Sequence, residues 1–255
     1  MANACIFCGR TGKLSAEHVF PDWSQPYLTS PHGQGTHERT ILHADGTKDE
    51  VSHRGDPATI TVRAVCEPCN TGWMSRLESK AKPFLLSMIQ GHTRTYHPAG
   101  QKLLAMWAVK TALVSGSKLK PRTPESFYSA LFTAQKPPDK TLVWLIATPR
   151  PYFTYVDYRP LKVSKTDEPP VTTENAYAAL LGIAHLAFYV VGWSDNEPDL
   201  DPLKSFEKSM LPLWPIQNRT QTFPPKGPRS QTGCAKSPSC AGPAGATRRR
   251  ETDSA

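Results

Sequence analysis

The stretch "VCEPCNTGWM" (65–74) decides which fold the N-terminal third of this chain is expected to adopt. Cys66 and Cys69 are separated by two residues, and Asn70 follows the second cysteine directly. Apolar residues then recur at every fourth position as far as Ala81, which is the spacing of one face of a helix. The stretch therefore predicts a metal-binding turn that opens a helix.

A second pair of cysteines with the same spacing lies near the N-terminus. Zinc takes four ligands in a tetrahedron, and one Cys-x-x-Cys turn supplies two thiolates from one side. The sequence predicts one structural Zn²⁺ ion, and the alternative is four reduced, unrelated thiols. Cys234 and Cys240 lie in a polar, proline-rich stretch and are not expected to take part. The predicted zinc ligands are Cys5, Cys8, Cys66 and Cys69.

The two cysteine pairs are 57 residues apart, from residue 9 to residue 65, which is longer than is usual in a zinc ribbon. An inserted hairpin accounts for this length, because the entropy of loop closure grows only slowly with loop length. Residues 40–52 contain two semi-alternating runs around Asp45–Gly46, which is typical of a β-hairpin. Residues 58–65 are β-branched and alternating, and they favour a strand that leads into Cys66.

The rest of the chain predicts an α+β arrangement of helices packed on a small antiparallel sheet. Pro83 is expected to end or restart the helix that follows the second cysteine pair. The predicted helices are 83–91, 99–116 and 124–135, and the predicted strands are 141–149, 152–160 and 175–193, the last with a joint near Gly182.

Composition restricts the class of protein only weakly. No apolar run approaches the roughly 20 residues of a membrane span, and no signal-peptide pattern is present, so we expect a cytoplasmic protein without a membrane partner. The net charge is +8, but the stretch from Arg219 onward has seven basic and two acidic residues and thus supplies +5 of it. Residues 1–80 have eight basic and nine acidic residues. Composition therefore permits nucleic acid binding without requiring it.

Between the cysteine pairs lies "SAEHVFPDW" (15–23), which contains the acid–histidine step Glu17–His18. Cys-x-x-Cys, an acid–histidine step followed by proline, and Cys-x-x-Cys-Asn at a helix start occur in that order. This order resembles the HNH endonuclease family in its zinc-stapled form, and "CNTGWM" resembles a phage and bacterial group of it. The resemblance covers about residues 4–80 and implies a ββα-metal unit, in which two strands and a helix surround one catalytic divalent ion.

The resemblance also implies roles for three residues. His18 would be the general base that takes a proton from the water attacking the scissile phosphate. Glu17 and Asn70 would hold the catalytic ion, and their oxygen ligands suit Mg²⁺ or Mn²⁺. DNA is the expected substrate and RNA the second choice. The alternative for Asn70 is that it only caps the helix, where asparagine is a preferred residue.

One feature departs from the family pattern. The middle asparagine of the family, which braces the loop that carries the base, would fall near Thr61, but no asparagine occurs from residue 19 to residue 69. His53, Asp56 or Thr61 takes over its role, or the site is inactive. Glu78, two helical turns beyond Asn70, is expected to face solvent.

The sequence is compatible with two functions from different classes. The first is a metal-dependent HNH-type endonuclease, and the second is a non-catalytic zinc-ribbon module that binds nucleic acid or protein. The expected organisation has three parts: a zinc-stapled ββα-metal module (1–82), an α+β accessory domain with an antiparallel sheet (83–216) and a disordered basic tail rich in Pro and Ser (217–255).

Overall fold

A computed structural model describes residues 4–28, 36–42, 48–54, 61–117, 123–164, 174–195, 198 and 210–224. The protein is a mixed α+β fold in which all strand pairs are antiparallel. The strands are β1 (Leu14–His18), β2 (Thr36–Leu42), β3 (Lys48–Arg54), β4 (Thr61–Cys66), β5 (Arg94–Tyr96), β6 (Thr141–Leu161), β7 (Ala176–Trp193), β8 (Met210–Trp214) and β9 (Gln221–Phe223). The helices are η1 (Asp22–Tyr27), α1 (Glu67–Cys69), η3 (Asn70–Met74), α2 (Ser75–Ile89), α3 (Pro98–Gly116) and α4 (Glu125–Ala134).

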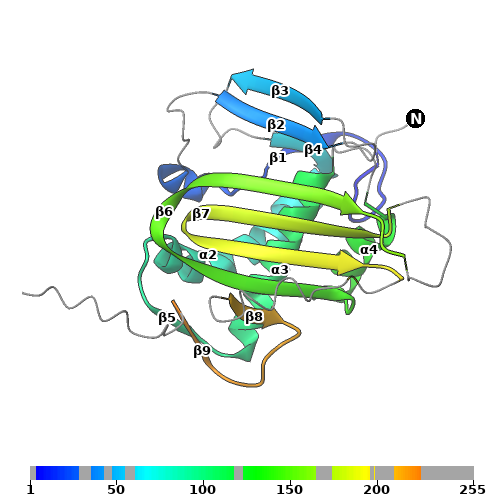
Figure 1. Cartoon of the computed structure of the whole chain (residues 1–255). Coiled ribbons are helices and arrows are strands. Elements are labelled where there is room, and N and C mark those ends of the chain that lie inside the picture. Colours follow the sequence, from blue (N-terminus) through cyan, green and yellow to red (C-terminus); the bar gives the residue numbers. More distant parts are fainter. Residues whose placement is uncertain are drawn as a thin grey trace, which may run out of the picture.

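The N-terminal part is a strand–strand–helix unit. β1 pairs with β4, with Leu14 opposite Cys66 and His18 opposite Thr61, and the register shifts between Ser15 and Glu17. The helices α1, η3 and α2 follow β4 without a loop. In chain order the hairpin of β2 and β3 comes between β1 and β4, and Figure 1 shows it above these two strands. Its register is centred on the predicted turn. The predicted hairpin and the predicted strand before the second cysteine pair are therefore confirmed.

The helix after that pair is longer than expected. Pro83 lies inside α2 and does not end it, so that prediction is wrong. A proline removes the hydrogen bond to the carbonyl four residues earlier, here Ser79, and both residues are exposed, so water solvates that carbonyl. The predicted domain boundary at residue 82 falls within this helix. The bend occurs earlier, at Gly72 in η3, whose φ and ψ are −89° and −107°.

The largest sheet has the order β7-β6-β8. Figure 1 shows β6 and β7 as a long hairpin that curves sharply, with α2 and α3 behind it. The bend in β7 occurs at Ala184, whose φ is +49°, and the register with β6 shifts there. The two ends of β7 come together, because Ser194 N–H donates to the carbonyl of Asn175 at 2.8 Å. The predicted joint in this strand is thus a bend within one strand.

One large hydrophobic core runs through the described residues, and a smaller separate cluster is formed by Ala176, Val191 and Trp193. The large core extends from Phe7, beside the cysteine cluster, to Phe188 on β7 and Leu213 on β8. α3 lies at its centre and contacts α2 and all three strands of the large sheet. Because α3 is covered on nearly every side, it is apolar all round and not amphipathic. The ββα unit and the large sheet therefore share one core.

The C-terminal part of the described chain belongs to the fold. β9 pairs with β5, with Arg94 opposite Phe223 and Tyr96 opposite Gln221. The predicted tail began at residue 217, so residues 217–224 do not belong to it. Residues 225–255 lie outside the described residues. Within the part that is described, no helix is both long and apolar enough to span a membrane.

Candidate metal centre and the acid–histidine step

The four predicted cysteines form one cluster. Their sulfur atoms all lie within 4.8 Å of one another, and Cys8 Sγ is 3.6 Å from Cys66 Sγ. Backbone bonds shape the first pair into a turn and attach it to β4, since Cys5 N–H donates to Arg10 O at 2.9 Å and Ile6 N–H to Ala64 O at 3.0 Å. The second pair follows at the junction of β4 and α1. The cluster is compatible with a bound zinc ion.

The electrostatics of the cluster also suit a cation. Burial raises the pKa of Cys5, but the backbone N–H groups of Cys66, Cys8 and Phe7 point at its sulfur and lower the value from 9.0 to about 7. Burial raises the pKa of both Cys66 and Cys69 above the ordinary value. Several thiolates are therefore costly here without a cation, and a dication compensates them.

Trp73 provides an independent indication. Its indole nitrogen is buried and donates to no hydrogen-bond partner. The indole nevertheless lies close enough to Cys69 to lower the pKa of that thiol. A thiolate bound to zinc is a stronger acceptor than a neutral thiol, so a metal at the cluster would give the indole N–H its partner. The donor set and this buried N–H both fit zinc.

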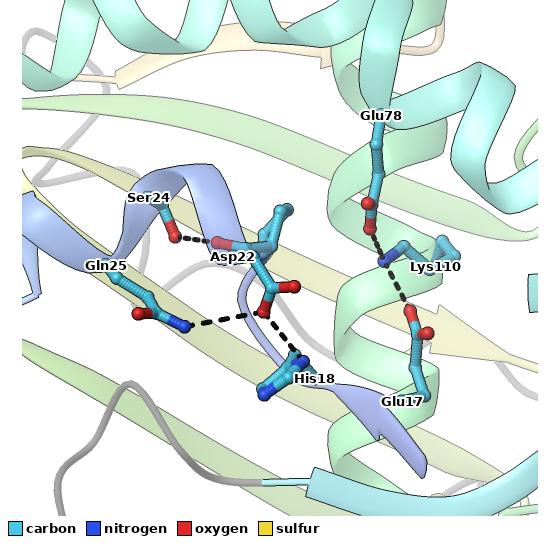
Figure 2. A network of polar contacts seen from close by, with 8 residues as sticks. Glu17, His18, Asp22, Ser24, Gln25, Glu78 and Lys110 are labelled. Carbon is cyan, nitrogen blue, oxygen red and sulfur yellow. Dashed lines mark hydrogen bonds and ion pairs between the residues drawn. The ribbon is translucent and has the colours of Figure 1, made fainter. Parts of the chain in front are cut away.

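Glu17 lies in a buried ion cluster that joins three elements. The Lys110 ammonium on α3 is 3.5 Å from Glu17 Oε1 on β1 and 2.6 Å from Glu78 Oε1 on α2 (Figure 2). The Lys110 side chain is fully buried, and those of Glu17 and Glu78 are 7% and 20% exposed. The expectation that Glu78 faces solvent is thus wrong, because its carboxylate turns inward to the ammonium.

The charges in this cluster do not balance. Burial alone would lower the pKa of Lys110, but Glu78 and Glu17 raise it above the ordinary value, so the lysine is charged. Burial raises the pKa of the Glu17 carboxyl, and Lys110 offsets only part of that effect. Two carboxyl groups thus share one ammonium.

Glu17, one of the two residues predicted to hold a catalytic divalent ion, already has a cationic partner. The carboxylate of Glu17 is buried and already has a cation, Lys110. Within the described part of the chain, the four cysteines form the only group of three or more His, Cys, Asp or Glu side chains with ligand atoms close enough for one metal ion.

The side chain of His18 is partly exposed, whereas that of its neighbour Glu17 is buried. Its side chain is 34% exposed, and its Nδ1 atom lies 2.9 Å from Asp22 Oδ1 (Figure 2). Asp22 begins the short 3-10 helix η1 and is exposed. The imidazole is therefore accessible from solvent, and the Asp22 carboxylate lies beside one of its two ring nitrogens.

Asn70 lies at the start of η3, directly behind the cluster. Its amide Nδ2 donates to Ser15 Oγ at 3.2 Å, and Ser15 Oγ donates in turn to the carbonyl of Val65 at 2.9 Å. The cap position of α1 is Cys66, and no side chain makes a capping hydrogen bond there. The alternative that Asn70 caps the start of the helix is therefore wrong, because Asn70 lies at the C-terminal cap position of α1. Its side chain instead ties the helix start to β1.

Thr61, Asp56 and His53 are the candidate replacements for the middle asparagine of the HNH pattern. Thr61 is exposed and lies opposite His18 in the register of β1 and β4. Asp56 and the side chain of His53 lie outside the described residues.

Sequence reasoning missed Asp22 and Lys110. Asp22 carried no signal beyond its position four residues after His18. Lys110 did carry one, because it is the only charged residue in the apolar stretch 103–116. A lone charge on a helix that is otherwise apolar predicts a buried partner.

Comparisons with models of known families, with curated proteins and with solved structures gave no match for this chain.

Proposed function

We propose that this protein is an HNH-type endonuclease that hydrolyses phosphodiester bonds in DNA, with His18 as the general base. The observation that carries the proposal is the position of His18. It ends one strand of a ββα unit whose other strand and helix are joined through the four-cysteine cluster, and its imidazole is accessible. A partly exposed imidazole is suited to take a proton near neutral pH.

The chemistry proposed for His18 is a single proton transfer. The imidazole nitrogen Nε2 accepts a proton from a water molecule, and the water oxygen attacks phosphorus. The bond from phosphorus to the leaving oxygen breaks, and that oxygen takes a proton from solvent. Zinc, when bound to the four cysteines, holds the N-terminal turn against the helix start and supplies no reacting group. Glu17 serves as the counter-ion of Lys110 in this scheme.

The ion pair of Glu17 and Lys110 favours a second candidate function, a zinc-ribbon module that binds nucleic acid or protein without cleaving it. In such a module an acid beside the histidine needs no metal, and a lysine is a sufficient partner. The two candidates differ in whether His18 is needed for a reaction.

Nicking and linearisation of supercoiled plasmid separate the two functions. The assay compares wild type with His18→Ala and with His92→Ala, a control at another exposed histidine. Each protein is tested with Mg²⁺, with Mn²⁺ and with EDTA, and its zinc content is measured. The nuclease proposal predicts cleavage by wild type and by His92→Ala, with a loss of about 100-fold or more in zinc-loaded His18→Ala. Equal cleavage by all three proteins, or none by wild type, would contradict it.

A further inference from the structure

We infer that Asp22 is the positioning residue of His18 and takes over the bracing role for which the sequence offers no middle asparagine. The inference states which imidazole nitrogen of His18 bears the proton. Only the statement that the other nitrogen acts as a base rests on the proposed function. Asp22 lies four residues after His18, and the chain between them turns at Pro21.

The contact between the two side chains is a short ion-pair contact, and the chemistry of its two atoms determines the direction of any hydrogen bond between them. Nδ1 of His18 and Oδ1 of Asp22 are 2.9 Å apart. A carboxylate only accepts hydrogen bonds, so in a neutral imidazole the proton must lie on Nδ1 for the bond to form. The lone pair is then on Nε2. The partner of one ring nitrogen thereby determines which nitrogen can act as base.

Asp22 is held in place by the turn from which it projects. Ser24 is fully buried, and both its N–H and its hydroxyl donate to the carbonyl of Pro21, at 2.8 Å and 2.6 Å. These two bonds fix the first turn of η1, where Asp22 stands. The Gln25 amide donates to the same Asp22 oxygen at 3.4 Å (Figure 2). The carboxylate is therefore oriented from two sides although it is exposed.

The turn itself is anchored to the core of the ββα unit. Val19 and Phe20, the two residues between His18 and Pro21, are both buried with 3% of their surface exposed. The burial of these two side chains restrains the backbone between His18 and Asp22. The backbone positions from which the two side chains project are therefore held by the core.

The tautomer of His18 can be measured without any cleavage assay. Protein labelled with ¹⁵N in its histidine rings gives a long-range ¹H–¹⁵N correlation spectrum whose pattern distinguishes Nδ1–H from Nε2–H. The spectrum is recorded at a pH where His18 is neutral. We expect Nδ1–H in wild type and a shift towards Nε2–H in Asp22→Ala. Asp22→Asn should weaken the preference for Nδ1–H less than Asp22→Ala does, because its amide can accept the bond through oxygen but can also donate to Nδ1 through nitrogen.

Asp139→Ala, which removes another exposed carboxylate, is the control and should leave the spectrum of His18 unchanged. Nε2–H in wild type, or an unchanged tautomer in Asp22→Ala, would overturn the inference. If the protein also cleaves DNA, Asp22→Ala should lose about twofold to fivefold in rate, the range expected for an exposed pair, and Asp22→Asn should lose less. An Nδ1–H tautomer in a protein that never cleaves DNA supports the inference and contradicts the proposed function. Cleavage of DNA by a protein whose His18 bears its proton on Nε2 overturns the inference and supports the proposed function.

Discussion

The ammonium of Lys110 lies 3.5 Å from the carboxylate of Glu17, and neither side chain is more than 7% exposed. Glu78 completes the cluster from α2 at 2.6 Å. The lysine on α3 thus connects β1 to α2, and it gives the buried acid next to His18 a permanent counter-ion. The position of the candidate base therefore depends on a helix that the sequence assigned to a separate domain.

Replacing Lys110 by methionine should destabilise the protein strongly. Removing one member of a buried ion cluster leaves a charge without a partner, which costs about 3–5 kcal/mol. Lys102→Met on the exposed side of the same helix is the matched control and should change the free energy of unfolding by less than about 0.5 kcal/mol. Urea unfolding at pH 7.5 measures both. A similar small effect for the two variants would show that the cluster contributes nothing.

The loss in free energy of unfolding that Lys110→Met causes should also depend on pH. Burial raises the pKa of Glu17, and loss of Lys110 raises it further. A raised carboxyl pKa favours the protonated folded state, so the associated stability is present below the ordinary value near 4.5 and is lost as pH rises through the folded value. The difference in unfolding free energy between wild type and variant should therefore be larger at pH 8 than at pH 5. An opposite trend would contradict the assignment of Glu17 as the partner.

Glu17→Gln should partly rescue Lys110→Met. The glutamine removes the most deeply buried negative charge, so the double variant leaves only Glu78, which is partly exposed. We expect the double variant to be more stable than Lys110→Met alone by at least about 1 kcal/mol, because residues in one ion cluster couple strongly. Additive effects in urea unfolding would show that the two residues do not act together.

Cys69→Ser should remove most of the bound zinc and lower the melting temperature by about 10 °C or more, since a structural zinc site contributes its binding energy to folding. Cys234→Ser is the control for loss of a thiol, and it should keep both zinc and melting temperature. Elemental analysis and thermal unfolding give the two readouts. Purified wild type without zinc, or Cys69→Ser with its zinc content unchanged, would contradict the metal site.

Much of the fold is predictable from the sequence because its signals are local. The Cys-x-x-Cys spacing, the turn at Asp45–Gly46 and the periodicity of 99–116 each predicted their element. The shared core was not predictable, because nothing local shows that α3 packs against both the ββα unit and the large sheet. The helix through Pro83 was missed for a similar reason, since tertiary packing overrides a local breaker.

The candidate site was predictable only in part. The spacing of the cysteines specifies a metal cluster, but the partners of Glu17 and His18 depend on side-chain directions that a sequence does not give. Lys110 is 93 positions away from Glu17 in the chain. Asp22 is near His18 in sequence, yet its direction depends on the buried turn at Ser24.

Asn70 should be distinguishable from a purely structural residue by comparison with Ser15. Asn70→Ala and Ser15→Ala both remove the hydrogen bond between helix start and β1, which contributes about 1 kcal/mol. Ser15→Ala also removes the bond to the carbonyl of Val65, so it should lose at least as much stability as Asn70→Ala. If Asn70 also contacts substrate or a catalytic ion, plasmid cleavage falls at least about tenfold further in Asn70→Ala. If Asn70→Ala and Ser15→Ala cleave plasmid at the same rate, Asn70 has only the structural role.

Chemical rescue tests the role of His18 most directly. His18→Gly creates space for a free imidazole, which can then accept the proton that the side chain would have taken. With zinc content verified, we predict that plasmid cleavage by His18→Gly is lost and then rises with imidazole concentration, while wild type and His92→Ala do not respond. Cleavage by His18→Gly at the wild-type rate, or a lost activity that imidazole does not restore at any concentration, would contradict His18 as the general base.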